Sequence, residues 1–253
     1  MSNIKSISSK RLKKNNQIKI FYEKHGWVLI KRAINLKLIF KIKKDLNHIS
    51  YALFKNSFEK SIEYLNKKNQ KKLFEFHKLI NKLISPSFLN FKIDEIFNII
   101  LNNKKPNFNI GTTFLLGLVN DKRLIYNYHQ ESSYMKKLKD ITSIHFPIFR
   151  ETNFKNGTMS VLDKSHKIMD LPYKKIVRKN SYTDLVPENI DEILKNYKEI
   201  FLNINVGDII FFHKNLIHKS NLNNSKKPRV CFVGRFTQDH NVSKFIEASA
   251  KKL

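Results

Sequence analysis

Apolar positions divide the chain into a first half with helical spacing and a second half with strand-like runs. Between residues 38 and 49, apolar side chains recur every three or four positions, which is the period of one face of an α-helix. The same period predicts helices over 190–197 and, with fewer apolar positions, over 72–84 and 94–101. Each of these segments is expected to pack one face against a larger core.

The second half is dominated by short runs of β-branched and aromatic residues bounded by Gly, Asn and Pro. Eight short strands, with helices grouped toward the N-terminus, predict a mainly β fold with helices (α+β), specifically a cupin-like jelly roll braced by N-terminal helices. The strands are predicted at 27–32, 111–119, 123–130, 141–149, 157–162, 201–206, 208–213 and 229–237.

The length of 253 residues fits one domain, because β-barrels with helical additions often reach about 250 residues as a single unit. Residues 1–16 are basic and polar without an apolar stretch, so we expect a disordered tail and not a signal peptide, followed by one domain over 17–253. No apolar run approaches the ~18 residues that span a bilayer. The only cysteine, Cys231, excludes an intramolecular disulfide and favours a reducing, cytoplasmic location.

The formal net charge of +27 would ordinarily suggest a nucleic-acid or anionic-surface partner. The basic residues are mostly lysines scattered over every segment, however, which is also what AT-rich coding produces. Both explanations stay open, and compositional drift is favoured over a nucleic-acid footprint. The scarcity of arginine makes each one conspicuous, and arginine occurs only at positions 11, 32, 123, 150, 178, 229 and 235.

Two segments far apart in the sequence carry the residues of a non-haem iron site. His129 and Glu131 are two positions apart, so on an extended strand their side chains project to the same side. A second imidazole is available from His218, with His213 as the rival, and two imidazoles plus one carboxylate suit Fe(II) while leaving positions open. Eleven residues after His218, Arg229 opens a predicted strand and is suited to bind a dicarboxylate such as 2-oxoglutarate.

With these residues the chain resembles the phytanoyl-CoA dioxygenase family of Fe(II)/2-oxoglutarate oxygenases. Residues 156–167, NGTMSVLDKSHK, are similar to the family's "NG…V…GSHK" segment. Residues 207–229 are similar to its "GD…FH…H.S…PR" segment, and residues 21–30 resemble its opening helix and strand. The resemblance covers about 17–237 and is weak from about 51 to 110.

The resemblance implies a double-stranded β-helix and an enzyme that uses Fe(II) as cofactor and 2-oxoglutarate as cosubstrate. It implies the metal ligands His129, Glu131 and His218, and a cosubstrate clamp formed by Arg229 and Ser220. Members act on very different small molecules and lipids, so the substrate does not follow from the fold. We expect hydroxylation of a small organic molecule, an anion being one option, with release of succinate and CO₂.

Two departures from the family pattern change this expectation. Most members carry Asp where this chain has Glu131, whose side chain is one methylene longer, so metal ligation is retained while the metal position is altered. Relatives that halogenate have a small residue there, so Glu131 favours hydroxylation or a related oxidation. Where the family often has Gly before Ser-His, this chain has Lys164, which predicts a different turn.

Two further residues are candidate substrate contacts. Alternation along the last predicted strand puts Arg229 and Arg235 on one face unless a bulge near Gly234 intervenes, so Arg235 is expected to contact an anionic substrate. His145 stands where relatives often have a large aromatic residue lining the site, with packing as the alternative. The long segment Ile168 to Asn189 is the expected lid.

Three other functions compete with this reading. An alkylation-repair nucleic-acid oxygenase would suit the basic charge, and Arg229 with Arg235 resembles its Arg-x5-Arg pair. Against it, Arg229 lies closer to His218 than that pattern suggests, and 156–167 matches the phytanoyl type better. A non-enzymatic basic binding protein would not need every ligand, and a cupin-like sugar isomerase would not need Arg229. The expected partner is a small-molecule substrate, nucleic acid is disfavoured, and no obligate protein partner is indicated.

Overall fold

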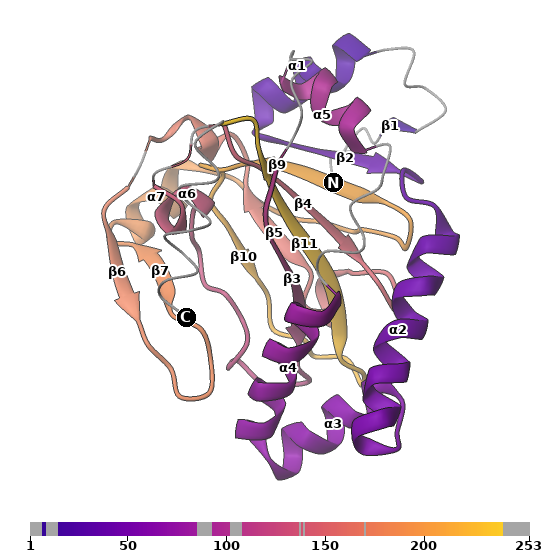
Figure 1. Ribbon diagram of the computed structural model, residues 1–253. Coiled ribbons are helices and arrows are strands. Elements are labelled where there is room, and N and C mark those ends of the chain that lie inside the picture. The colour runs from indigo at the N-terminus through magenta and orange to yellow at the C-terminus, as the bar shows by residue number, and fades with distance from the viewer. Residues whose placement is uncertain are drawn as a thin grey trace.

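Two β-sheets face each other in a computed structural model and form the predicted double-stranded β-helix (Figure 1). The larger sheet runs in the order β1 (Ile7–Ser8), β2 (Trp27–Lys31), β9 (Ile209–His213), β4 (Thr142–Pro147), β11 (Arg229–Thr237) and β3 (Phe108–Gly117). The smaller sheet runs in the order β10 (His218–Ser220), β5 (Met159–Leu162) and β8 (Glu199–Phe201), and a separate hairpin joins β6 (Tyr173–Ile176) to β7 (Asp184–Pro187). The structure describes residues 7–8, 15–84, 93–101, 108–136, 138, 140–169 and 171–239.

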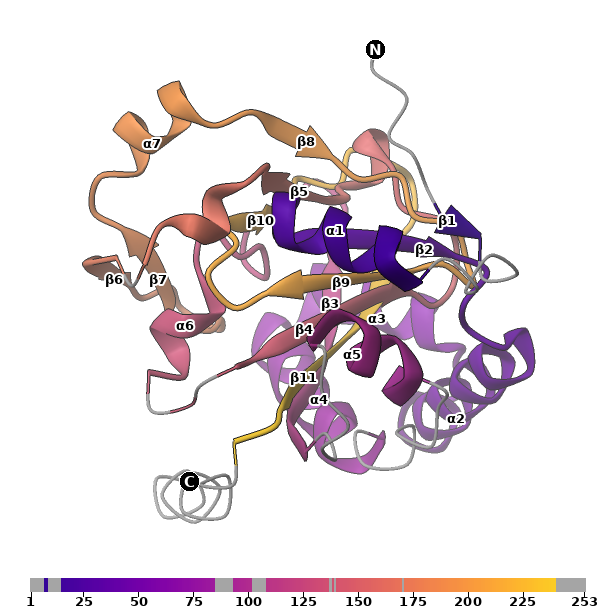
Figure 2. The same cartoon turned by 90° about the horizontal axis from the view of Figure 1, so that it is seen from above.

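The helices α1 to α5 cover the outer face of the larger sheet, and the smaller sheet lies on its other side (Figure 2). The helices are α1 (Asn15–His25), α2 (Leu36–Phe54), α3 (Phe58–Lys68), α4 (Gln70–Ile84), α5 (Ile93–Leu101), α6 (Glu131–Tyr134) and α7 (Ile190–Asn196), with 3-10 turns η3 (Phe154–Asn156) and η4 (Ser165–Lys167). No helix in the described part of the chain is both long and apolar enough to cross a membrane.

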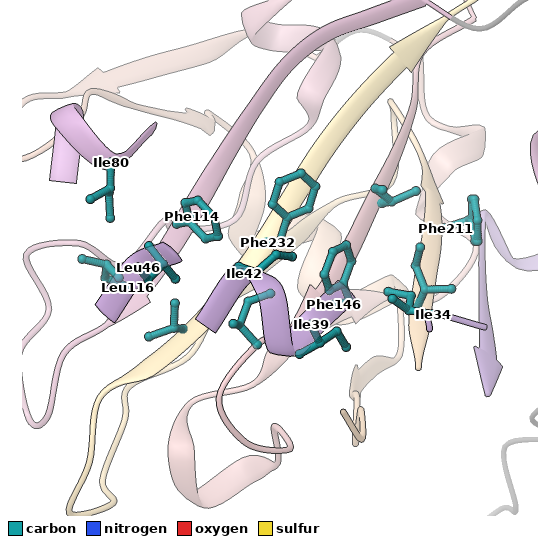
Figure 3. Packing of buried hydrophobic residues seen from close by; sticks show 14 of the residues in the cluster. Ile34, Ile39, Ile42, Leu46, Ile80, Phe114, Leu116, Phe146, Phe211 and Phe232 are labelled. Atoms are coloured by element: carbon teal, nitrogen blue, oxygen red, sulfur yellow. The ribbon is translucent and has the colours of Figure 1, made fainter. Parts of the chain in front are cut away.

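The strands of the larger sheet carry apolar side chains on both faces, and the side chains on one face pack against the helices to form a core. Ile42 and Leu46 from α2 pack with Phe232 of β11 and Phe114 of β3 (Figure 3). A completely buried Phe contributes about 2–3 kcal/mol by removing its ring from water, so this layer fixes the larger sheet firmly.

The helix α2 begins where the Asn35 side chain accepts a hydrogen bond from the amide of Lys37, at 2.9 Å.

The opposite face of the larger sheet fills the barrel interior. Leu29, Ile210 and Phe212 alternate with residues of the helix-side core and pack against Met159 and Val161 of the smaller sheet. Because both faces of these strands are buried, the sequence is apolar almost throughout, as expected for strands between two layers.

Most predicted elements are confirmed, and two strand predictions are wrong. Over 123–130 the chain forms a turn closed by Asp121, which accepts a hydrogen bond from the Arg123 amide at 2.8 Å, and then runs extended. Over 201–206, β8 ends at Phe201 and only an isolated bridge follows. The helix α3 and the strands of the β6–β7 hairpin were not predicted, because their apolar runs are short.

The predicted tail over 1–16 is described only in part. Ile7 and Ser8 pair in parallel with Ile30 and Lys31, and α1 begins at Asn15. The remainder of that prediction lies outside the described residues. The division into a tail and one domain over 17–253 therefore stays a prediction.

Burial of one histidine predicts an acid-sensitive core. His77 of α4 is 2% exposed and contacts the carbonyl of Phe114 in β3, and burial lowers the pKa of His77 to about 4. Below pH 6.5 the unfolded chain takes up a proton that the folded chain excludes. The free energy of unfolding should thus fall by up to about 1.4 kcal/mol per pH unit as the pH drops toward 4.

We expect His77→Gln to reduce this pH dependence, measured as urea midpoints between pH 7 and pH 5. The exposed His48 of α2 offers a matched control, and His48→Gln should leave the slope unchanged. Equal slopes in wild type and His77→Gln would contradict the assignment.

Candidate metal and cosubstrate site

His129 and His218 face each other across a pair of backbone hydrogen bonds. The His129 amide donates to the carbonyl of His218 at 3.0 Å, and the His218 amide donates back at 3.1 Å. Directly opposite residues of an antiparallel pair place their side chains on the same side, and here the ring centroids are 4.2 Å apart. Backbone pairing therefore brings together two imidazoles that are far apart in the sequence.

Backbone carbonyls orient both imidazoles. Nδ1 of His129 lies 2.7 Å from the carbonyl of Asn127, and Nδ1 of His218 lies 2.9 Å from the carbonyl of Leu216. A carbonyl only accepts, so each Nδ1 carries the proton and each Nε2 presents a lone pair, as in metal-binding histidines. Burial lowers the pKa of His218, and the neighbouring His129 lowers it further, which favours the neutral form that binds metal.

Glu131 completes the group at the first residue of α6. Its Oε1 lies 3.6 Å from Nε2 of His218 and 3.8 Å from Nε2 of His129. Burial would raise the pKa of the carboxyl, but the Arg235 guanidinium together with both histidines holds it well below its usual range. Gln130 is extended and precedes the helix, so the chain turns after His129-Gln130 and does not continue as the predicted strand.

The donor set fits a divalent iron ion. One atom each from His129, Glu131 and His218 lies within 4.8 Å of the others, and no other such group of His, Cys, Asp or Glu occurs in the described ranges. Two neutral imidazoles and one carboxylate on one side of a cavity are the ligands that non-haem Fe(II) takes. His213 lies elsewhere, beside His166 at 5.6 Å between ring centroids, so the structure brings His218 and not His213 to the pair.

Arg235 forms an ion pair with Glu131 inside the barrel. Its Nε donates to Oε2 of Glu131, and its Nη2 donates to Oε1 at 3.2 Å. No bulge occurs at Gly234, because the register of β11 against β3 shifts only after Arg235. The side chain therefore faces the cavity as expected, while its contact with a substrate stays a prediction.

Arg229 is a buried cation without an acidic partner in the described part of the chain. Its side chain is 1% exposed, Nη1 lies 3.5 Å from Sγ of Cys231, and Nε has no hydrogen-bond acceptor. An unpaired buried charge is costly, and a carboxylate supplied by a ligand would remove that cost. This arrangement fits the distal carboxylate of 2-oxoglutarate.

Ser220 and His145 line the same cavity as the three candidate metal ligands. Ser220 is buried, follows His218 by two residues on β10 and lines the same cavity. Burial lowers the pKa of His145 to about 3, with further lowering by Arg229 and His218, so its imidazole is neutral. Its Nε2 is buried without a hydrogen-bond partner and is available to a bound ligand.

The three candidate metal ligands, Ser220, His145 and Arg235 line one cavity of about 190 Å³, whereas Arg229 is not one of its lining residues. Besides the predicted residues, its walls include Leu115, Tyr126, Tyr134, Met135, Met159 and Phe212. Strand alternation would have identified Met159 and Phe212 as facing the interior. The two tyrosines and Met135 flank the His-x-Glu segment where the chain is irregular, so no period signals their direction.

The segment from Ile168 to Asn189 packs directly against the metal-ligand segment. The Gln130 side chain donates to the carbonyl of Ile168 at 3.2 Å, and the Asn127 side chain donates to Asp184 at 2.8 Å. The hydroxyl of Tyr134, a cavity residue, accepts a hydrogen bond from the Leu185 amide at 3.0 Å. The β6–β7 hairpin is thus fastened to the cavity wall, and its predicted role as a lid stays a prediction.

Residues 22–231 match the family model of phytanoyl-CoA dioxygenase (PhyH). Among solved structures, the epimerase SnoN in complex with Fe³⁺, alpha ketoglutarate and nogalamycin RO has 10% identity and a TM-score of 0.58, covering 88% of this chain and 83% of its own. EvdO2 from Micromonospora carbonacea var. aurantiaca, complexed with 2-oxoglutarate, has 14% identity and a TM-score of 0.61, covering 87% and 89%. At these identities the likeness shows a shared fold. No curated protein matches the sequence.

Replacing Arg229 should weaken 2-oxoglutarate binding. In Arg229→Leu the distal carboxylate would be buried without its charged partner, a loss of roughly 2 to 5 kcal/mol. Calorimetric titration of the anaerobic Fe(II)-loaded protein measures this directly. Arg123→Leu removes an arginine that pairs with Asp121 outside the cavity and serves as control. Unchanged affinity in Arg229→Leu would place that residue outside the cosubstrate site.

Gly117 tests the same contact without removing a charge. A Cβ at Gly117 would lie 2.8 Å from Nε and 3.1 Å from Cβ of Arg229, so Gly117→Ala should displace the guanidinium. We expect 2-oxoglutarate affinity to fall by less than the roughly 2 to 5 kcal/mol expected for Arg229→Leu, because the guanidinium is displaced but not removed. Gly111 is on the same strand and a Cβ there meets nothing within 4 Å, so Gly111→Ala should bind normally. Equal affinities for the two variants would contradict the placement of the clamp.

Proposed function

Because the chain belongs to the phytanoyl-CoA dioxygenase family, whose members are Fe(II)- and 2-oxoglutarate-dependent enzymes, we propose that it hydroxylates a small organic molecule with release of succinate and CO₂. The unpaired Arg229 carries the proposal, because a protein that only bound metal at His129, Glu131 and His218 would have no need of a buried guanidinium in the same barrel.

In the proposed reaction, the two histidines and Glu131 hold the metal at one end of the cavity. Arg229 and Ser220 bind the distal carboxylate of the cosubstrate, which fixes its direction along the barrel. When bound, iron and 2-oxoglutarate supply the activation of O₂ that replaces a substrate C–H by C–OH while 2-oxoglutarate becomes succinate and CO₂. The protein contributes binding, orientation and exclusion of water.

We assign exclusion of water to the 168–189 segment. Its two strands form a hairpin that is separate from both sheets of the barrel, and such hairpins have little stability of their own. Its hydrogen bonds to Asn127, Gln130 and Tyr134 all reach the segment that carries His129 and Glu131. Substrate entry past this hairpin would be coupled to the metal ligands through those contacts.

The charges facing the cavity favour an uncharged substrate. Arg235 is already paired with Glu131, and the side chain of Lys219 reaches Glu199 at 3.0 Å and lies over the ring of Tyr128. Arg229 is reserved for the cosubstrate in this proposal. The remaining walls are aliphatic, aromatic and thioether side chains, so we replace the expectation of an anionic substrate by a small, largely apolar one.

A substrate should accelerate succinate release from 2-oxoglutarate above the slow uncoupled background, because it completes the site for O₂. We propose a screen of uncharged apolar molecules, anionic metabolites, sugar nucleotides, acyl thioesters and alkylated oligonucleotides, with His218→Ala as the inactive control. Uncharged small molecules are expected to stimulate turnover.

Stimulation by alkylated oligonucleotides alone would replace this proposal by nucleic-acid repair. Oligonucleotides that bind without turnover, with affinity falling steeply as salt rises, would indicate only counterion release from a lysine-rich surface. Stimulation confined to anionic metabolites would show that the uncharged-substrate assignment is wrong.

A further inference from the structure

The two oxygens of the Glu131 carboxylate have different surroundings. Oε1 lies 3.6 Å and 3.8 Å from the Nε2 atoms of His218 and His129. Oε2 is turned to Nε of Arg235, whose Nη2 also reaches Oε1 at 3.2 Å. The planar guanidinium matches a carboxylate at two points, so it fixes both the position and the rotation of the group.

We propose that Arg235 is a positioning residue that presents Glu131 to the metal through one oxygen. Oε1 is the ligand atom, and Oε2 is retained by Arg235. This inference rests on the proposed metal site and deepens it, because it adds a residue that neither binds the metal nor belongs to the cosubstrate clamp. In this proposal the Arg235 guanidinium binds Glu131 and does not recognise the substrate.

Glu131 needs such support more than a shorter carboxylate would. Its side chain has one more rotatable bond than Asp, and ordering a long side chain costs conformational entropy. It stands at the first residue of a four-residue helix, which is a short element to hold a ligand. Apart from the two histidines, Arg235 is the side chain found to contact its carboxylate among the described residues.

Arg235 is itself held by a rigid element. It lies on β11, where its backbone is in register with Gly111 of β3 on one side and Ser143 of β4 on the other. The next residue, Phe236, is buried in the helix-side core. Through Arg235, the strand β11 thereby fixes the position of the Glu131 carboxylate, which lies outside the sheet.

A positioning role and a purely electrostatic role of Arg235 predict opposite changes in metal affinity when the residue is replaced. A guanidinium beside the site repels a divalent cation, so a purely electrostatic role means that removing Arg235 tightens metal binding. A positioning role means that removal loosens it, because outer partners of metal ligands typically contribute 10- to 100-fold in affinity. The direction of the change therefore decides between them.

The experiment compares wild type, Arg235→Lys and Arg235→Met, titrated anaerobically with Co(II) without cosubstrate and followed by calorimetry and visible absorption. Co(II) accepts the same nitrogen and oxygen ligands as Fe(II) and reports its geometry in the visible spectrum. We expect both variants to bind Co(II) about 10- to 100-fold more weakly, with altered spectra. Lys keeps the charge but lacks the fork, so it should not restore affinity. Arg123→Lys changes an arginine outside the cavity and should match wild type.

Unchanged or tighter Co(II) binding in Arg235→Met, or wild-type affinity and spectrum in Arg235→Lys, would overturn the positioning role. If Arg235→Met fails to fold by circular dichroism, Arg235→Lys decides alone, because it leaves no uncompensated buried carboxylate. Absence of Co(II) and Fe(II) binding by the wild type would instead refute the proposed metal site. The two failures are thus distinguishable.

Discussion

The candidate site depends on the two backbone hydrogen bonds between His129 and His218. They join an irregular segment to β10, and so bring two imidazoles to one side of the barrel. Since each Nδ1 is also bound to a backbone carbonyl, the direction of both rings is set by main-chain atoms. Hydrogen bonds between main-chain atoms persist when the surrounding side chains are replaced. This is consistent with the 10–14% identity to solved structures of the same fold.

Buried charge has to be balanced inside the barrel. Glu131 and Arg235 neutralise each other, whereas Arg229 has no acidic partner in the part of the chain that the structure describes. Burying an unpaired ion is costly, and in the proposed function the carboxylate of the cosubstrate would supply the missing partner of Arg229. Any ligand that binds only the folded form adds to its stability, and the cosubstrate would do so here.

The strand β11 and the β6–β7 hairpin differ in how firmly the rest of the fold holds them. The strand β11 carries both Arg229 and Arg235, lies between β3 and β4, and is covered by the helices α2 to α4. Functional groups on such an element keep their geometry. The hairpin β6–β7 belongs to neither sheet of the barrel and is hydrogen-bonded to the cavity residue Tyr134, so in the proposed function it could change position without disturbing the core.

The sequence determined the properties that are local or strictly periodic. The helical spacing of Ile42 and Leu46 was sufficient to predict α2, and alternation along 229–237 was sufficient to put Arg229 and Arg235 on one face. The order of the family-like segments along the chain was sufficient to predict that His129, Glu131 and His218 lie close together. These predictions held because each depends on contacts between nearby residues or on a pattern shared with relatives.

Only the tertiary structure decided the contacts between segments that no pattern relates. Glu131 and Arg235 are 104 residues apart, and their pairing depends on where α6 begins relative to β11. The β6–β7 hairpin was not predicted, and its hydrogen bonds join it to Asn127 and Tyr134, which are about 50 residues away in the sequence. In each case the energy comes from a long-range contact, a buried ion pair or a fold-specific hydrogen bond, and such contacts leave no period in the sequence.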